Sequence, residues 1–319
     1  MRFPVFDLHC DTALGLLGKD MDQAGSLRSN SLHIDLERAS KLPGYCQCFA
    51  CFTTPFMEEW YKTTPTLVFE REIATIQREL DKNQDLMELA YSAAEVEELR
   101  AKGKMAAILT IEGPAGFGFD PELLENLYQI GFRISTLGWN ECNPLTGSHR
   151  TGGGLTDMGK AYVKEAQRVG MRIDLSHCSD EAFWDIMKIT EAPILATHSS
   201  SRAVWDSSRN RTDDMFKAIL ETGGVAGINL YEGFIGQEGK ADIDSVCDHI
   251  FHFIELDPTG KHIALGGDLD GCDPLPAGLE GIQDYPKLAQ CLLDRGADER
   301  TVHNIFWNNA LGVIDKCSM

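Results

Sequence analysis

The 319-residue sequence predicts an α/β fold, a (β/α)8 or TIM barrel that forms one domain over residues 1–319. Eight short apolar runs recur along the chain, helical patterns lie between most of them, and histidines or acids follow several runs. Short apolar strands separated by helices are typical of a buried parallel sheet. Barrels of this type commonly reach this length as a single domain.

Each of the eight expected strands is a short apolar segment that ends at a polar or glycine-rich signal. They span 5–9, 46–52, 105–111, 132–139, 171–175, 194–197, 224–230 and 263–267. An open, doubly wound sheet would also accommodate this alternation. The barrel is favoured because its functional groups gather at the carboxyl ends of several strands, which is where unusual polar residues fall here.

Start signals support helices between these strands. Ser92 and Glu95 have capping-box spacing, Asp120 precedes a first-turn proline, and Ser179 is followed by two acids that favour a helix N-terminus. Further helices are expected at 155–168, 213–222 and 242–255. The glycine run 152–154 is expected to be a loop, because it does not follow a strand closely.

The formal net charge of -20 argues against nucleic acid and anionic membranes as partners. Residues 1–7 lack the apolar core of a secretion signal, and no stretch of about 18 apolar residues exists, so we expect a cytoplasmic protein. The ten cysteines are then expected to be reduced. Cys46, Cys48 and Cys51 interrupt an apolar strand, which favours buried thiols over a zinc site.

Residues with metal-ligand chemistry follow several strands. His9 and Asp11 are two positions apart, so an extended chain points both to one side. Glu112 closes an apolar strand, where an unpaired carboxylate is costly to bury. His177 and His198 each follow an apolar run. Taken singly, each has an ordinary explanation, such as a core histidine or a carboxylate paired with arginine.

Taken together, five strand ends carry His, Asp or Glu, the last in a glycine-rich segment with Asp268 and Asp270. A barrel places all five on one rim. Mixed imidazole and carboxylate ligands suit zinc better than manganese or iron. Five ligands exceed one tetrahedral site that also holds water, and they suit two metals that share a bridging carboxylate. The residues therefore predict a two-metal hydrolase.

In order along the chain, these residues resemble the membrane (renal) dipeptidase family, zinc peptidases of the amidohydrolase-like, metallo-dependent hydrolase barrels. The resemblance covers nearly the whole chain and points to a soluble, bacterial-type member. It is carried by His9-x-Asp11, Glu112-Gly113, Asp174-Leu175-Ser176-His177, Thr197-His198-Ser199-Ser200, Arg209-Asn210 and Gly267-Asp268-Leu269-Asp270-Gly271.

The resemblance implies a ligand set for two Zn2+ ions. His9 and Asp11 would hold one ion, His177 and His198 would hold the other, and Glu112 would bridge them. It also implies hydrolysis of dipeptides, with tolerance of L,D-dipeptides and some β-lactams, and a homodimer.

Further roles follow from the same resemblance. Asp268 would be the general acid–base, and Arg209 would bind the terminal carboxylate of the substrate. Animal members carry a histidine after the fourth strand, where this chain has Trp139 and Asn140. We expect Asn140 to donate a hydrogen bond to an oxyanion, with His149 as an alternative.

Three rival interpretations remain open. Another metal-dependent amidohydrolase, such as a deaminase, lactonase or cyclic amidase, could use similar ligands. A barrel without catalysis could serve as a binding protein. A nucleotide-binding open sheet is disfavoured because the sequence lacks a phosphate-loop motif and a convincing strand–GxGxxG–helix unit.

Overall fold

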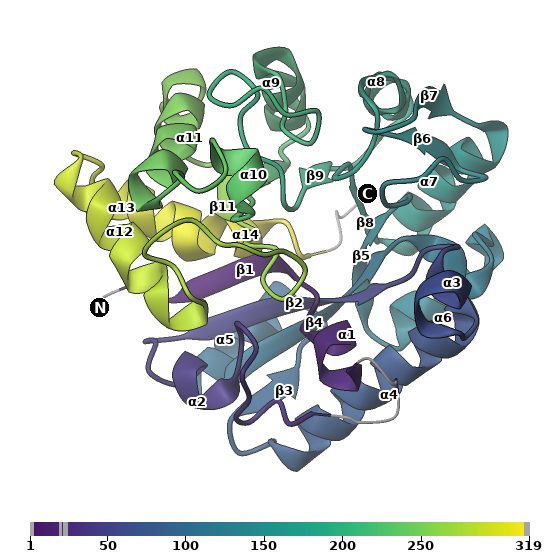
Figure 1. Cartoon of the computed structure of the whole chain (residues 1–319), viewed down its shortest axis with the longest axis horizontal. Helices are drawn as coiled ribbons and strands as arrows, with labels where there is room; N and C mark the ends of the chain where they lie inside the picture. Colours follow the sequence, from purple (N-terminus) through teal and green to yellow (C-terminus); the bar gives the residue numbers. More distant parts are fainter. Residues whose placement is uncertain (1–2, 19–20, 22–24, 316–319) are drawn as a thin grey trace.

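The computed structural model describes residues 3–18, 21 and 25–315, and it confirms the barrel (Figure 1). Every pairing between neighbouring barrel strands is parallel, and contacts β1–β2, β2–β4 and β1–β11 close the sheet on itself. Around the barrel the strands are β1 (Val5–Cys10), β2 (Tyr45–Phe52), β4 (Met105–Glu112), β5 (Phe132–Thr136), β8 (Arg172–Asp174), β9 (Leu195–Ala196), β10 (Val225–Ile228) and β11 (Ile263–Leu265).

All eight predicted strands are present, with ends that differ by a few residues. The largest difference is at 132–139, where the strand ends at Thr136 and the chain turns toward the rim. The last three residues of that range, which include Trp139, therefore belong to the loop after β5 rather than to the barrel wall.

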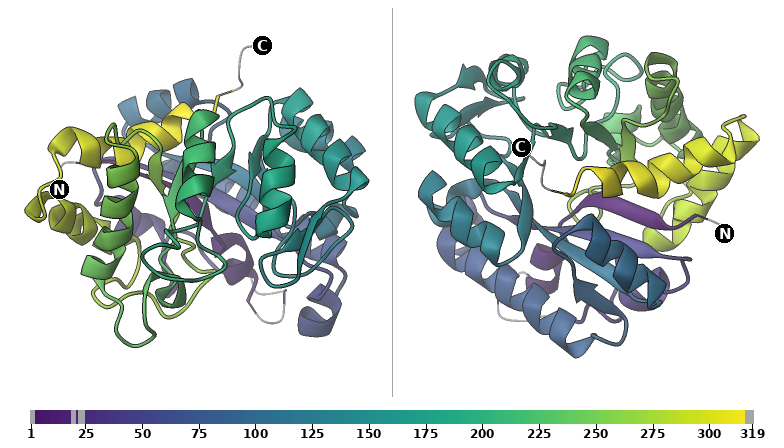
Figure 2. Two further views of the ribbon diagram at one scale, coloured as in Figure 1. Left: turned by 90° about the horizontal axis from the view of Figure 1, so that it is seen from above. Right: turned by 180° about the vertical axis from the view of Figure 1, so that it is seen from behind.

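Helices surround the barrel on its outside (Figures 1 and 2). They are α1 (Thr12–Leu17), α2 (Leu36–Ala39), α3 (Met57–Tyr61), α4 (Pro65–Lys82), α5 (Ala93–Ala101), α6 (Leu124–Gln129), α7 (Asp157–Val169), α8 (Asp180–Met187), α9 (Asp213–Glu221), α10 (Glu232–Ile235), α11 (Ile243–Leu256), α12 (Tyr285–Asp294), α13 (Glu299–His303) and α14 (Asn309–Gly312). Three short 3-10 helices are η1 (Pro114–Phe117), η2 (Pro121–Leu123) and η3 (Ile282–Asp284), and η4 (Asn304–Asn308) is a π-helical turn.

The predicted helix starts are present. The Ser92 side chain accepts from the Glu95 amide at 3.2 Å, while the Glu95 carboxylate accepts from Tyr91 N rather than Ser92 N. Asp120 caps η2, which leads into α6, and Ser179 accepts from the Ala182 amide at 2.9 Å. These side chains satisfy amides that have no partner within the first helical turn.

The loop prediction for 152–154 is wrong. Gly152–Leu155 forms strand β7, which pairs antiparallel with β6 (Thr146–Ser148) in a hairpin outside the barrel. Gly152 and Gly153 have φ of 65° and 92°, and a Cβ on Gly147 would lie 1.9 Å from Gly152 O. The glycines thus allow a backbone approach that side chains would block. A ninth strand, β3 (Met87–Leu89), extends the sheet beside β4.

The buried thiols agree with the sequence interpretation. Cys46, Cys48 and Cys51 are fully buried in β2.

Trp307 packs on Phe6 near the start of β1, with ring centroids 5.7 Å apart, and so covers the end at which the strands begin. The described residues do not include residues 1 and 2 of the N-terminal segment, nor the tenth cysteine, Cys317.

Within the described ranges, no helix combines the length and apolar character needed to cross a bilayer.

Candidate metal centre

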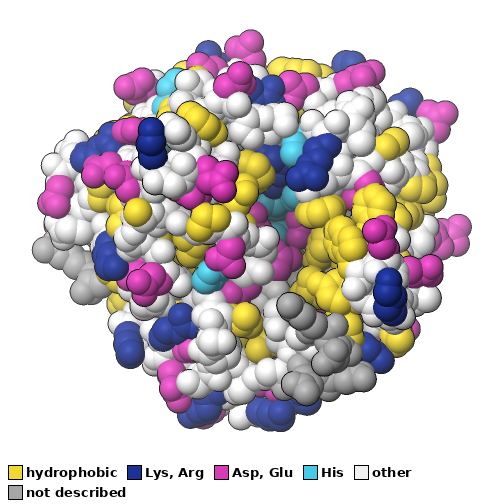
Figure 3. All heavy atoms as spheres, in the orientation of Figure 1, with side chains coloured by type: hydrophobic (Ala, Val, Ile, Leu, Met, Phe, Trp, Pro, Cys, Tyr) yellow, Lys and Arg dark blue, Asp and Glu magenta, His cyan; other side chains and the backbone are white. Residues whose placement is uncertain are grey.

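The structure brings all five predicted ligands together at the carboxyl ends of the strands. His9 lies in β1 and Asp11 directly follows it, Glu112 ends β4, and His177 and His198 follow β8 and β9. All five are buried, with at most 6% of each residue exposed. Figure 3 shows a hollow near the middle of this face, with histidine and acidic side chains on its floor.

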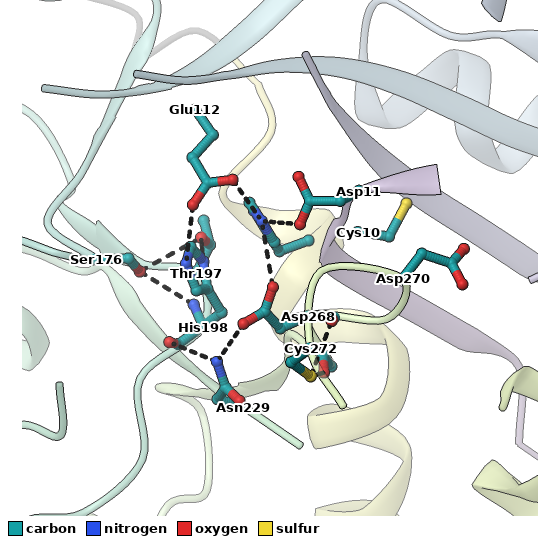
Figure 4. Close-up of polar contacts among 12 residues, drawn as sticks. Cys10, Asp11, Glu112, Ser176, Thr197, His198, Asn229, Asp268, Asp270 and Cys272 are labelled. Carbon is teal, nitrogen blue, oxygen red and sulfur yellow. Dashed lines mark hydrogen bonds and ion pairs between the residues drawn. The ribbon is translucent and has the colours of Figure 1, made fainter. Parts of the chain in front are cut away.

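Glu112 occupies the middle of the cluster. Its Oε2 lies 3.3 Å from His9 Nε2, whereas its Oε1 lies 2.8 Å from His177 Nε2 and 3.7 Å from His198 Nε2. Figure 4 shows Glu112 beside His198, Asp11 and Asp268. His9 Nε2 is also 3.4 Å from Asp11 Oδ2. The two carboxylate oxygens therefore face two different groups of nitrogen and oxygen atoms, which is the arrangement of a bridging ligand.

The hydrogen bonding of the cluster fits a bound cation. His9 Nε2 and Asp11 Oδ1 are buried and lack a hydrogen-bond partner among the described residues. An unpaired buried polar atom carries a large desolvation penalty. Two triads, His9–Glu112–His198 and His9–Asp11–Asp268, each place three ligand atoms within 4.8 Å of one another. Imidazole and carboxylate donors suit zinc.

The protonation states of the isolated chain are set by burial and by neighbouring charge. Burial lowers the pKa of His9, but Glu112 and Asp11 outweigh it, and the resulting pKa lies well above the ordinary range. Burial and repulsion from Asp11 raise the pKa of Glu112 to about 8. Burial and the nearby charge of Arg209 hold the pKa of His177 well below 6.5. Burial and the nearby charge of His9 do the same for the pKa of His198. The neutral imidazole is the form that binds a metal.

Neighbouring side chains orient His198. Thr197 Oγ1 lies 2.8 Å from His198 Nδ1 and also hydrogen bonds to Asp174. Ser176 Oγ accepts from the His198 amide at 3.1 Å. With its Nδ1 engaged by this Asp174–Thr197 pair, the ring presents Nε2 to the cluster. Such outer contacts fix the orientation of metal-binding histidines.

Asp268 lies at the edge of the cluster, 3.7 Å from His9 Nε2. The Asn229 amide donates to its second oxygen at 2.9 Å, and burial raises the pKa of Asp268. A Cβ on Gly271 would lie 2.0 Å from Asp11 Oδ2 and 2.6 Å from Asp268 Oδ1, so glycine is needed there for close approach of the backbone.

The backbone at this rim is strained. Six non-glycine residues in the described part of the chain have positive φ, and three of them are His177 at 71°, Asp268 at 57° and Asp270 at 68°. Such conformations cost about 1–3 kcal/mol each and concentrate at functional sites. Their grouping here independently marks the loops after β8 and β11 as functional.

Arg209 is buried beside the cluster rather than exposed as an ordinary surface arginine. Its Nη2 lies 3.0 Å from His177 Nε2, its Nη1 donates to Ser199 Oγ at 3.4 Å, and its guanidinium sits 5.3 Å from the ring centre of Phe234. Its Nε is buried and has no hydrogen-bond partner among the described residues. A buried guanidinium with a free donor is suited to a carboxylate ligand.

Asn140 contacts two histidines. Its Oδ1 lies 2.9 Å from His177 Nδ1 and 2.7 Å from His149 Nε2, and His149 Nδ1 lies 2.9 Å from Ser208 Oγ. The oxygen accepts only if both ring nitrogens carry hydrogen, which leaves His177 Nε2 unprotonated, the form that can bind a metal. Burial, with Arg209 nearby, lowers the pKa of His149 to about 3, which agrees with a neutral ring.

Sequence reasoning did not assign roles to several residues that support the cluster. Asn229, Thr197 and Asp174 orient Asp268 and His198, and Asp270 accepts from Thr12 at 2.6 Å. Their position at or near strand ends could have marked them in the sequence as rim residues. Their specific partners come from other strands and were not visible in the sequence.

A closed parallel barrel with a histidine and carboxylate cluster at the carboxyl ends of its strands defines the class of metal-dependent α/β-barrel hydrolases. The chain belongs to the membrane dipeptidase family, peptidase family M19, whose model matches residues 1–318. This places it among hydrolases that act on peptide bonds.

Individual relatives agree with this assignment. The chain is 35% identical over 217 residues to an uncharacterised dipeptidase of Schizosaccharomyces pombe, a match that covers 66% of this chain and 53% of the relative. It therefore spans about half the length of that relative. The crystal structure of dipeptidase AC, a family M19 metallopeptidase, is 25% identical with a TM-score of 0.87 and 99% of both chains covered.

A metallopeptidase of Rhodobacter sphaeroides, liganded with a phosphinate mimic of L-Ala-D-Ala, shares the fold. Its identity to this chain is 24%, its TM-score is 0.86, and the match covers 98% of this chain and 99% of that one.

Proposed function

We propose that this protein is a dipeptidase that uses two zinc ions to hydrolyse the peptide bond of dipeptides, L,D-dipeptides included. The observation that carries the proposal is the position of Glu112, whose two oxygens face His9 on one side and His177 and His198 on the other. Membership of the dipeptidase family supports the reaction class. The phosphinate mimic of L-Ala-D-Ala bound by the Rhodobacter sphaeroides protein supports the inclusion of L,D-dipeptides.

In this proposal, His9 and Asp11 would hold one zinc ion, His177 and His198 would hold the second, and Glu112 would be shared between them. The chemistry that the ions supply when bound is activation of a water molecule and polarisation of the scissile carbonyl.

The other site residues act on the substrate. Arg209 binds its terminal carboxylate, because its guanidinium is buried beside the cluster with a free Nε. Asp268 takes the proton of the attacking water and transfers it to the leaving amine. Burial raises the pKa of this carboxyl, which brings it closer to the value a proton carrier needs. With Asn140 Oδ1 engaged by two histidines, Asn140 Nδ2 is the atom that would donate to an oxyanion.

A different amidohydrolase reaction on cyclic amides or esters remains the second candidate, because the ligand set alone does not name the substrate. The buried Arg209 favours dipeptides over such substrates, since a lactone or cyclic amide offers no free carboxylate to pair with a guanidinium. A cytoplasmic homodimer completes the proposal, and light scattering tests its oligomeric part.

Turnover of L,L- and L,D-dipeptides by the zinc-loaded protein, beside a chelated control and a tripeptide series, tests the reaction. We expect zinc-dependent cleavage of dipeptides and none of tripeptides. Failure to cleave any dipeptide at full zinc occupancy would contradict the proposal and favour another amidohydrolase reaction.

Glu112→Gln tests the two-metal assignment directly. The variant keeps the shape of the side chain but removes the charge between the two histidine groups. We expect about two zinc ions per chain in the wild type, fewer in the variant by elemental analysis, and a loss of at least about 100-fold in kcat. Near-wild-type turnover with full zinc content would contradict a bridging role.

A further inference from the structure

An aromatic wall, formed by Phe52, Phe56, Trp60 and Trp139, extends from the metal centre to the protein surface. Trp139 begins it, with its ring centroid 6.2 Å from that of the ligand His177. Phe52 and Trp60 pack on Trp139 edge to face, with centroids 5.3 and 5.5 Å away, and Phe56 lies 5.8 Å from Trp60. The contacts thus form a continuous series of rings.

The outer rings of the wall are open to solvent. Trp60 is 45% exposed and Phe56 is 42% exposed, although both are large and apolar. Together with Trp139 they line a depression of about 590 Å³, whose other lining residues include Arg150 and Thr151. In Figure 3, hydrophobic side chains gather along one side of the central hollow. Adjacent exposed aromatic side chains of this size mark a ligand or partner site.

The outer part of the wall, formed by Phe52, Phe56 and Trp60, lies across the barrel rim from Arg209, whereas Trp139 and Arg209 both lie against His177. Phe52 ends β2 and Phe56 and Trp60 follow it, while Arg209 lies in the loop after β9. In the strand order β1-β2-β4-β5-β8-β9-β10-β11, β2 and β9 are diametrically opposed. A dipeptide that places its carboxylate on Arg209 and its scissile bond at the metal ligands therefore directs its N-terminal residue toward the wall.

We propose that the aromatic wall is the subsite for the side chain of the N-terminal residue, and that it selects dipeptides whose N-terminal residue is aromatic or large and apolar. This inference rests on the proposed dipeptidase function and adds the substrate class. The occupant is a substrate side chain, because the wall is continuous with the metal centre through Trp139 and His177.

Steady-state kinetics on L-Phe-L-Ala, L-Ala-L-Phe and Gly-L-Ala test the proposal. We expect kcat/KM for Phe-Ala to exceed that for Gly-Ala by at least about tenfold, a difference that burial of one aromatic side chain supplies. Reversing the dipeptide to Ala-Phe should remove most of that advantage.

Trp60→Ala removes an outer ring that contacts neither a predicted metal ligand nor Arg209 among the described contacts. It should lower the Phe-Ala to Gly-Ala ratio of kcat/KM about fivefold or more. Trp184→Ala is the matched control, because Trp184 is 39% exposed on α8, outside the wall, and its loss should leave the ratio unchanged. Calorimetric affinities for phosphinate mimics of Phe-Ala and Gly-Ala should show the same pattern without turnover.

Equal kcat/KM for the three dipeptides, a preference for Ala-Phe, or an unchanged ratio in Trp60→Ala would each overturn the subsite. These results differ from failure of the proposed function, in which the zinc-loaded protein cleaves none of the three and binds neither mimic.

Discussion

At the scale of single residues, the metal centre depends on side chains that never touch a metal. His177 projects from a backbone position with φ of 71°, and contacts with other side chains set the orientation of its ring. Asn140 supplies one such contact through Oδ1, and His149 and Ser208 extend it to the loop that carries Arg209. The expected carboxylate-binding loop and one expected metal ligand are thereby connected by hydrogen bonds.

Asn140→Ala should weaken zinc binding at His177 by about 10–100-fold, the usual effect of removing an outer-shell partner of a ligand histidine. Competition against a fluorescent zinc chelator measures this affinity without relying on activity. Asn126→Ala replaces an exposed asparagine on α6 and serves as the control. This control variant should leave the zinc affinity unchanged. An unaltered affinity in Asn140→Ala would contradict this role of Asn140 in orienting His177.

The residues whose position at the rim the sequence predicted and those it missed differ in a physical way. His9, Asp11 and Glu112 could be predicted because apolar strands fix their place on the rim, whatever the loops do. The contact of Asn140 with His149 could not be predicted, because it needs the β6–β7 hairpin to return His149 to the rim. Arg209 was assigned only through the family resemblance, and its burial gives that assignment a physical basis.

At the scale of elements, Ser179 is one of several contacts that join the β6–β7 hairpin to the barrel. Ser179 accepts from the Ala182 amide at the start of α8 and donates to Gly153 O in β7 at 2.6 Å. Sequence reasoning found the helix cap but not the hairpin contact, because the glycine run that forms β7 has no strand-like side chains. A single hydroxyl thus serves as both a cap and a tether.

Ser179→Ala should lower the free energy of unfolding by about 2 kcal/mol, since it removes a cap worth about 1 kcal/mol and a second, partly buried hydrogen bond worth about the same. Urea unfolding measures the loss. Thr212→Ala, which removes a cap on the Met215 amide at the start of α9, provides the comparison and should cost about 1 kcal/mol. Equal losses in the two variants would mean that the contact with Gly153 contributes nothing.

Helix α4 carries a buried acid that makes stability depend on pH. Glu72 is fully buried, its Oε1 accepts from Phe52 N at 3.1 Å, and its Oε2 has no hydrogen-bond partner among the described residues. Burial raises the pKa of Glu72 well above its ordinary range. The folded state therefore keeps a proton that the unfolded chain releases near pH 4.3.

Because the folded state binds the extra proton, the contribution of Glu72 to stability falls as pH rises from about 4.3 toward the folded pKa. Glu72→Gln keeps the acceptor for Phe52 N but removes this dependence. The variant should match wild type near pH 4 and become more stable than wild type at pH 8. Urea unfolding of both proteins at several pH values checks this, and a gap that shrinks with rising pH would contradict it.

At the scale of the whole molecule, closure of the barrel is what assembles the site. The eight apolar runs predicted the strands and hence the shared rim, since every barrel strand presents its carboxyl end to the same side. Strand β3 and the hairpin escaped prediction because they are short and carry little apolar pattern. The aromatic wall escaped too, because Phe56 and Trp60 meet Trp139 only after β2 and β5 are folded into one barrel.

Bringing strand ends together also concentrates negative charge. Asp11 and Glu112 are buried, and the Asp268 side chain is 13% exposed, in a chain whose formal net charge is already -20. A bound cation offsets this repulsion in the folded state and finds no such site in the unfolded chain. Metal binding should therefore stabilise the entire barrel rather than only its loops, because the ligands come from strands on several sides of it.

Removing metal with a chelator should lower Tm by about 5–10 °C, as expected for a ligand present at about 1,000 times its Kd. Differential scanning calorimetry of metal-free and zinc-loaded protein measures the shift. Zinc should restore Tm, whereas magnesium should not, because imidazole ligands suit zinc. In Glu112→Gln the shift should shrink, since one acid is neutral and the bridge is lost. An identical Tm after elemental analysis has shown zinc removal would mean that the acidic cluster is held by the barrel without help from a cation.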